Sequence, residues 1–168
     1  MDLQIKKATY DDIDECMELA DFANKLMLSR NNPQWDCGYP TAEILREDVD
    51  KNQLIIALEN EEIVGMLVIQ LDKDEIYEEY DFWSPGDYIS VHRVVSKRRG
   101  LGRKLLNLSI EKAKEMGVNV RIDTHVKNLN MLALIESLGF VEVGLTKQGY
   151  IDFTLAPTYE LVLEKINR

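Results

Sequence analysis

Residues 96–106 read SKRRGLGRKLL, a short stretch that holds five positive charges and two glycines. The chain around it is acidic, with 30 Asp and Glu residues against 20 Lys and Arg, and it has a formal net charge of −10. An acidic chain repels nucleic acid and anionic lipid at long range, so neither is an expected partner. The positive charge of this stretch is therefore expected to act locally.

The stretch lies where a strand pattern, residues 88–96, gives way to a helix pattern, residues 102–117. Backbone N–H groups in the first turn of a helix lack partners, and the helix dipole adds positive potential there. Gly100 and Gly102 leave room for a ligand to approach the backbone closely. The sequence thus predicts a phosphate site. The alternative is a glycine turn followed by a solvated basic helix start.

Alternating and helical hydrophobic patterns divide the rest of the chain. Strands are predicted at residues 3–8, 88–96, 118–125, 140–146 and 158–166, and as a hairpin over residues 54–71. Helices are predicted at residues 9–30, 41–51, 102–117 and 128–139, and residues 72–87 form a long acidic and aromatic loop. This order predicts a three-layer α/β fold with a mixed sheet, and the length fits one domain, residues 1–168.

The sequence also predicts the compartment and the state of the cysteines. No apolar run approaches the length of about 18 residues that a membrane span requires, and residues 1–12 lack the apolar stretch of a signal peptide. We therefore expect a cytoplasmic protein with no membrane partner. Cys16 and Cys37 are too few for a disulfide framework and lack metal-ligand spacing, so both are expected to be reduced and no metal is expected.

Two phosphate-binding patterns do not fit the stretch at residues 96–106. A dinucleotide-binding turn needs a third glycine, but Leu105 or Leu106 occupies the region where that glycine belongs. The nucleoside-triphosphate pattern G-x-x-x-x-G-K-[ST] is absent from the chain. Neither phosphate-binding pattern therefore accounts for Gly100 and Gly102.

A third pattern fits better. Residues 97–102, KRRGLG, resemble the pyrophosphate loop of the Gcn5-related N-acetyltransferase (GNAT) superfamily, which reads Gln or Arg, two residues, Gly, any residue, then Gly or Ala. Downstream, NLNMLALIESLGFVEVG is similar to the family's Asn, helix and Gly-Phe segment, with Asn128 at the Asn and Gly139-Phe140 at the Gly-Phe. More narrowly, QWDCGYPT, HRVV, IDTH and NLNM resemble one bacterial branch of mostly undetermined substrate.

The resemblance implies a GNAT-type three-layer α/β/α fold with a mixed, mostly antiparallel central sheet, and acetyl-CoA as the acyl-donor cosubstrate. It implies that the pantetheine arm pairs with the edge of the strand VHRVVS, where a backbone N–H near Val94 or Val95 stabilises the oxyanion. The residues it implies for coenzyme A are Val94, Val95, Lys97, Arg98, Arg99, Gly100, Leu101, Gly102, Arg103, Asn128 and Met131.

The chain departs from the family pattern at three places. Lys97 stands where the family usually has Gln or Arg, which keeps the charge. The connection from His92 to the glycines is shorter than usual. Ile135 stands where many members carry a Tyr that protonates the departing thiolate. A thiol resembling that of cysteine leaves tolerably as thiolate, so this acid helps without being obligatory.

An amine acceptor requires a proton acceptor, because an alkylammonium with a pKa near that of lysine is neutral in only about one molecule in a thousand at pH 7. His125 and Asp123, at the end of a strand beside the expected acyl site, are the leading candidates. A water relay and His92 are the other choices, together with the acidic loop residues Glu78, Glu79 and Asp81. In the competing interpretation, the DTH end only caps a loop and His92 is a packed core residue.

Two loops, residues 31–40 and 74–88, are expected to close over the acyl end. Their aromatic side chains would form walls for a cationic amine beside the acidic loop residues. The expected substrate-binding residues are Trp35, Tyr39, Tyr80 and Trp83. The competing interpretation is that Trp35 and Trp83 anchor the loops to the core.

The sequence therefore predicts an N-acetyltransferase that acts on a small amine or an exposed peptide amino group, in which the amine attacks the thioester directly. The alternative is a non-catalytic acyl-CoA-binding or interaction module with the same fold, which a blocked or unlined acyl pocket would favour. Family members often pair through sheet edges or helices, which allows a homodimer, but no residue pattern here specifies one.

Overall fold

A seven-stranded sheet runs through the computed structural model, which describes residues 2–35, 38–148 and 154–163. The strands are β1 (Leu3–Lys7), β2 (Leu54–Glu59), β3 (Glu62–Gln70), β4 (Tyr88–Ser96), β5 (Asn119–Asp123), β6 (Val141–Thr146) and β7 (Ala156–Leu161). The helices are α1 (Ile13–Ser29), α2 (Ala42–Asp50), α3 (Leu101–Met116) and α4 (Leu129–Ser137). The strand order across the sheet is β1-β2-β3-β4-β5-β7-β6.

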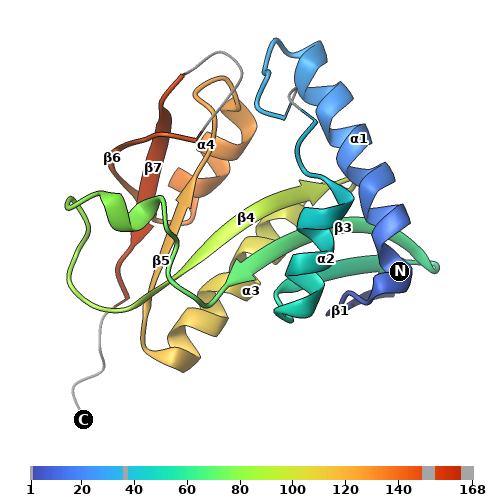
Figure 1. Ribbon diagram of the computed structural model, residues 1–168, viewed down its shortest axis with the longest axis horizontal. Helices are drawn as coiled ribbons and strands as arrows, with labels where there is room; N and C mark the ends of the chain where they lie inside the picture. The colour runs from blue at the N-terminus through green and yellow to red at the C-terminus, as the bar shows by residue number, and fades with distance from the viewer. Residues whose placement is uncertain (1, 36–37, 149–153, 164–168) are drawn as a thin grey trace.

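The sheet is mixed and mostly antiparallel, as predicted. Of the strand pairs in the described ranges, β4 and β5 run parallel, and the others run antiparallel. Helices α1 and α2 lie on one face of the sheet and α3 on the other (Figure 1). The predicted three-layer α/β/α arrangement is therefore confirmed.

Each face of the sheet has its own hydrophobic core. On the first face, α1 and α2 pack Leu19 and Leu45 onto the β2–β3 side of the sheet. On the second face, α3 and α4 pack Leu105 and Ile135 onto strands from both sides of the sheet, including Ile122 of β5. The second core therefore joins the two halves of the sheet, whereas the first belongs to one half.

Local signals in the sequence account for the helix ends. The Thr41 hydroxyl accepts a hydrogen bond from the Ile44 N–H (3.1 Å) and caps α2. Gly100 precedes α3 and Gly117 ends it, with φ of 80° and 69°, values that glycine adopts at little cost. The Asn128 side chain caps α4 by accepting from the Met131 N–H (3.4 Å).

The structure places several helix and strand boundaries differently from the sequence prediction. The first helix is preceded by a 3-10 turn, Tyr10–Asp12, and the acidic loop contains another, Tyr77–Glu79. The last strand begins two residues earlier than predicted, because Ala156 pairs with Thr146 of β6. It ends at Leu161, and residues 164–166 of that prediction lie outside the described residues.

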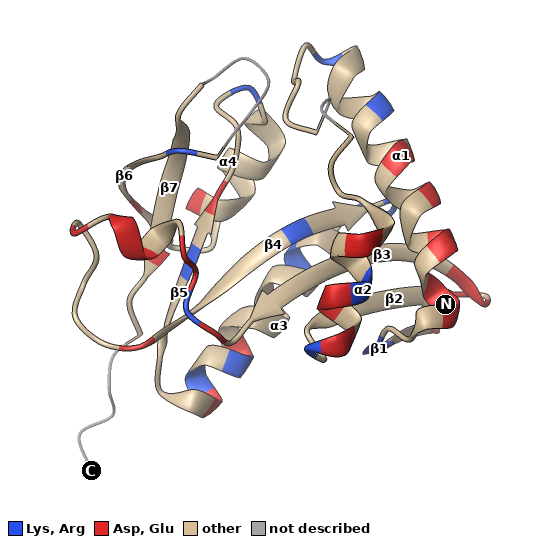
Figure 2. Cartoon of the chain, viewed as in Figure 1, with Lys and Arg blue, Asp and Glu red and all other residues tan. Residues whose placement is uncertain are grey.

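Acidic side chains occupy α1, α2 and the Tyr77–Glu79 turn (Figure 2). None of the helices in the described ranges is both long and apolar enough to cross a bilayer.

Candidate active site

Strands β4 and β5 pair over only three residues, from Tyr88 opposite Asn119 to Ser90 opposite Arg121. Beyond Ser90 the two strands part, although both continue. A cleft of about 600 Å³ lies there, with walls from β4, β5, α1, α4, the loops after α1 and β3, and the first turn of α3. The sequence-predicted residues that line it are Trp35, Tyr39, His92, Val94, Val95, Gly102, Asp123, Asn128 and Met131.

A bulge in β4 accompanies this separation. Val68 of β3 pairs with His92, whereas Met66 pairs with Val95, so β4 contains an extra residue between these pairs. Arg93, within the bulge, has a positive φ of 51°, which is unusual for a residue with a side chain. The bulge lies on the wall of the cleft and changes the direction of the residues that follow it.

Arg93 is held from two sides. Its guanidinium donates to both carboxylate oxygens of Asp48 (2.8 and 2.6 Å) and to the Tyr39 hydroxyl (2.5 Å). Burial disfavours the charged guanidinium, but Tyr39 and Asp48 outweigh it and raise the pKa of Arg93. Burial also raises the pKa of Tyr39, against the opposing effect of Arg93. Asp48 and Arg93 were not predicted as site residues.

One end of the cleft is the first turn of α3. Gly102 lines it, and a Cβ at this position would meet only a Leu134 methyl, at 3.4 Å. A Cβ at Gly100 would meet no atom within 4 Å. Because the first N–H groups of a helix have no intrahelical acceptor, this turn offers donors to an anion. Leu101, by contrast, is buried in the α3 core.

Three of the five basic side chains around this turn contact other protein groups. Lys97 lies 3.8 Å from Glu62 and over the Phe22 ring, Arg98 lies 3.3 Å from Glu59, and Arg103 donates to the Ser137 hydroxyl (2.8 Å). Within the described part of the chain, the remaining two form no ion pair. They are the exposed residues Arg99 and Lys104.

Asn128 links the α4 end of the cleft to the loop after α1. Its amide donates to the Gln34 side-chain oxygen (3.1 Å), which also accepts from Thr124 (3.3 Å). Gln34 lines the cleft and was not predicted as a site residue.

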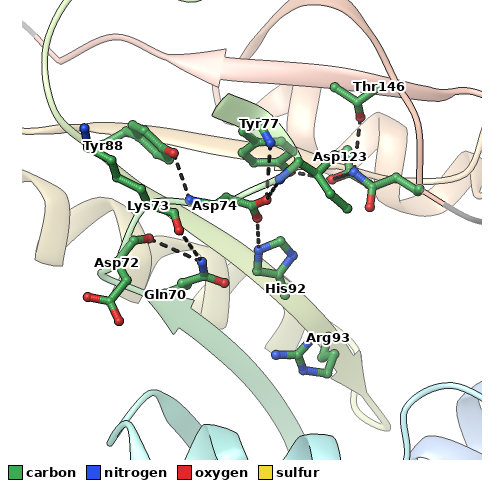
Figure 3. A network of polar contacts seen from close by, with 12 residues as sticks. Gln70, Asp72, Lys73, Asp74, Tyr77, Tyr88, His92, Arg93, Asp123 and Thr146 are labelled. Atoms are coloured by element: carbon green, nitrogen blue, oxygen red, sulfur yellow. Dashed lines mark hydrogen bonds and ion pairs between the residues drawn. The ribbon is translucent and has the colours of Figure 1, made fainter. Parts of the chain in front are cut away.

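The other end of the cleft carries a polar network (Figure 3). His92 Nε2 lies 2.8 Å from an Asp74 oxygen, and both residues line the cleft. The Asp123 carboxylate accepts from the Tyr77 hydroxyl and from the Gln148 amide (2.9 Å). The negative charge at this end of the cleft therefore comes from two carboxylates, Asp74 of the β3–β4 loop and Asp123 at the end of β5.

The ionisation of Asp74 follows from its neighbours. Burial opposes the charged form, but the hydrogen bond and charge of His92 and the N–H groups of Tyr77 and Ile76 outweigh it, so the pKa of Asp74 is lowered. Those N–H groups donate to one oxygen (3.3 and 3.0 Å), and His92 contacts the other. Asp74 lies in the run DKDE, at the start of the loop that the sequence predicts as acidic and aromatic.

Other predicted residues lie outside the cleft lining. His125 is fully buried, and its Nδ1 accepts from the Lys127 N–H (3.0 Å). Tyr80 accepts from the Lys147 N–H (2.8 Å), and Trp83 donates to the Tyr77 carbonyl (2.8 Å) and packs on the Arg121 guanidinium. The loop acids that the sequence offered as bases are exposed and do not line the cleft: Glu78, Glu79 and Asp81.

Ile135, which stands where many GNAT members carry a tyrosine, is fully buried in the α3–α4 core. In the residue ranges that the structure describes, no group of three or more His, Cys, Asp or Glu could hold a metal ion.

Comparison with known proteins agrees with this architecture. The model of the acetyltransferase (GNAT) family matches residues 13–140. A GNAT-family acetyltransferase from Streptococcus agalactiae is similar, with a TM-score of 0.81 and 23% identity over 97% of this chain and 96% of that one. No curated protein matches the chain.

Two further structures similar to this chain contain cofactors. Salmonella typhimurium yncA, with its cofactor acetyl-CoA, has a TM-score of 0.71 and 18% identity over 100% of this chain and 98% of that one. The PaiA N-acetyltransferase of Thermoplasma acidophilum, in complex with coenzyme A, has a TM-score of 0.71 and 14% identity over 97% and 100%.

Proposed function

This chain belongs to the acetyltransferase (GNAT) family, and we propose that it transfers the acetyl group of acetyl-CoA to a primary amine by direct attack of the amine on the thioester. The family makes it an acyl-CoA-dependent acetyltransferase. The primary amine acceptor and its direct attack on the thioester are proposed in addition to the family's activity.

The observation that carries the proposal is the separation of β4 from β5. A parallel pair that parts after three residues leaves the edge of β4 without its partner strand, beside a lined cleft. An extended pantetheine arm would fit this edge as an added strand. The backbone N–H of Val94 or Val95 would then face the thioester carbonyl and stabilise the oxyanion of the tetrahedral intermediate. A lined cleft favours the enzyme over a non-catalytic module.

The first turn of α3 suits the pyrophosphate. The N–H groups around Gly102 would bind its oxygens, and the exposed charges of Arg99 and Lys104 would add attraction. Asn128 and Met131, at the start of α4, would line the pantetheine arm on the opposite wall. Lys97, Arg98 and Arg103 would contribute to the local potential from their existing contacts.

The acceptor end favours a cation. Trp35 and Tyr39 give it aromatic surface, and Asp74 and Asp123 give it negative charge. An ammonium group is stabilised by aromatic faces and by carboxylates. With Ile135 buried in the core, no tyrosine at that position protonates the leaving group, so the sulfur leaves as thiolate or takes a proton from the attacking amine.

Calorimetric titration of acetyl-CoA tests the cofactor half of the proposal. Gly102→Glu would place a carboxylate at the predicted pyrophosphate site, and we expect it to abolish micromolar binding. Gly102→Ala adds only a Cβ that meets Leu134 at 3.4 Å, and it should bind within a few-fold of wild type. Lys112→Gln, at an exposed position farther along α3, controls for the change of one charge unit. Equal binding by Gly102→Glu and wild type would contradict the assignment.

Thiol release tests the acceptor half. Acetyl-CoA is incubated with benzylamine, tyramine, spermidine or a lysine-containing peptide, and free coenzyme A is measured with the acetylated product. We expect release that depends on the amine and a product whose mass increases by one acetyl group. Binding of acetyl-CoA together with a release rate that no amine increases would count against an amine acceptor.

A further inference from the structure

We propose that His92 is the catalytic base that takes the proton from the acceptor amine, and that Asp74 is the residue that positions it. This inference rests on the function proposed above and adds the proton acceptor to it. The sequence favoured a different histidine, His125, and it is the geometry of the structure that favours His92.

His92 has the right location. It is the second residue of β4 after Ser90, where β4 and β5 stop pairing, and it lines the cleft. It also lies immediately before the bulge at Arg93, opposite Val68. An acceptor that attacks a thioester lying along the β4 edge would enter beside this ring.

The ring is oriented by its partner. Nε2 lies 2.8 Å from an oxygen of Asp74, a contact that favours the tautomer with its proton on Nε2. The neutral imidazole then carries its lone pair on Nδ1, as a base requires. Among the described residues, no hydrogen bond or ion pair reaches Nδ1, and His92 retains some exposure in the cleft. This is the arrangement of a base with an orienting carboxylate.

Asp74 is itself fixed. One oxygen accepts from the N–H groups of Ile76 (3.0 Å) and Tyr77 (3.3 Å), and the backbone N–H of Asp74 donates to the Tyr88 hydroxyl (2.9 Å). The residue is 8% exposed. The carboxylate is thus held by two N–H groups and its backbone by Tyr88, which keeps the imidazole in one orientation.

The two bases favoured by the sequence are less suited. The Asp123 carboxylate already accepts from the Tyr77 hydroxyl and the Gln148 amide, both on the same oxygen. His125 is fully buried and does not line the cleft. In this scheme, Asp123 attracts the ammonium group of the acceptor, and His125 stabilises the loop between β5 and α4.

Proton transfer by His92 balances as follows. Nδ1 takes one proton from the ammonium, and the neutral nitrogen forms a C–N bond with the acetyl carbon while the carbonyl becomes an oxyanion. When the intermediate collapses, the C–S bond breaks and the second amine proton passes to the sulfur, which leaves as the thiol. His92 then returns its proton to solvent through the cleft.

The pH dependence of the reaction reflects every charged or titratable group near the ring. Asp74 contacts it from the β3–β4 loop, and the Tyr77 ring lies 6.1 Å from it between centroids. Other groups nearby are Asp123 on β5, Arg93 on β4 with its partner Asp48, and Tyr39 from the loop after α1. Protonation of His92 at low pH removes the base, so kcat/KM is expected to fall on the acidic side.

The test compares wild type, His92→Ala and Asp74→Asn with acetyl-CoA and benzylamine as probes. For His92→Ala we expect kcat/KM to fall by about 10²- to 10⁴-fold, with loss of the acidic limb of the pH profile and an acetyl-CoA Kd within threefold of wild type. Added imidazole should restore part of the rate. Asp74→Asn should reduce the rate less and shift the acidic limb, whereas Asp74→Glu should retain more activity.

Three results would overturn the inference. These are a His92→Ala rate within threefold of wild type, loss of acetyl-CoA binding together with activity, and an acidic limb that disappears only in His125→Ala. Nitrogen-15 NMR of histidine-labelled wild type adds a readout that needs no acceptor. The Nε2–H tautomer is expected for His92, and the Nδ1–H tautomer would contradict the assignment. If the tautomer is correct but no amine is acetylated, it is the proposed function that fails.

Discussion

Arg93, inside the bulge of β4, forms a two-point ion pair with Asp48 of α2, at 2.8 and 2.6 Å. The pair joins the wall of the cleft to the helix that covers the first core. Both side chains are almost fully buried, so each charge depends on the other for compensation.

Removal of one partner should therefore be costly. Arg93→Ala leaves the Asp48 carboxylate buried without its cation, and we expect a loss of about 3–5 kcal/mol in the free energy of unfolding, measured with urea. The exposed pair of Lys73 and Glu78 (3.5 Å) provides the control, since Lys73→Ala should change stability by less than about 1 kcal/mol. Equal effects of the two changes would mean that the buried pair contributes no more than a surface one.

Stability should depend on pH through Asp74. Its pKa is lowered from the ordinary 3.8 in the folded state, so folding favours the carboxylate form. The resulting stabilisation is complete above the unfolded-state value and is lost as the pH falls through the folded-state value. The stability difference between wild type and Asp74→Asn should thus be largest at pH 5 to 6 and shrink towards pH 3, as urea titrations at each pH would show. A difference that grows on acidification has the wrong sign.

Gly144 of β6 lies against an aromatic cluster. A Cβ there would lie 2.3 Å from the Phe82 ring, and that ring contacts Tyr80 and Trp83 at centroid distances of 5.2 and 4.8 Å. Gly144→Ala should destabilise the fold by about 1–3 kcal/mol. In the Phe82→Ala background the same change should cost much less, which a double-mutant cycle measures. Additive effects would show that the Phe82 ring is not the source of the cost.

The thiol of Cys16 should be unreactive in the folded protein. Burial, together with the charges of Asp12 and Glu15, raises its pKa to about 12, so little thiolate forms at pH 8. In a Cys37→Ser background, a disulfide reagent should label Cys16 only after the addition of denaturant. Rapid labelling of the native protein would mean that α1 opens readily. Cys37 itself lies outside the described residues.

The order of elements could be predicted from the sequence because hydrophobic periodicity and capping residues are local. Thr41, Gly100 and Gly117 each mark a helix end in the sequence and in the structure. The glycine turn between β4 and α3 was equally accessible, since two glycines between a strand and a helix have a local meaning, and its binding of coenzyme A stays a prediction. Boundaries that depend on a partner strand, such as the start of β7 at Ala156, were not accessible.

The acceptor end of the cleft depends on contacts between distant segments. Asp74 looks solvated within DKDE, and only the fold buries it against His92 of the next strand. The bulge at Arg93 has no sequence signal, because arginine does not favour a positive φ. Tyr80 and Trp83 have the composition of a binding wall, but they pack on neighbouring loops and on Arg121 instead.

The short pairing of β4 with β5 also has a mechanical meaning. Only the α3–α4 core spans both halves of the sheet, whereas the α1–α2 core, over the described residues, belongs to the β1–β4 half alone. Among the described residues, polar contacts on the α1 face, such as those of Gln34 with Thr124 and Asn128, join the two halves in place of a shared hydrophobic core. Under the proposed function, acceptors of different bulk would enter from the α1 face without rearrangement of the α3–α4 core.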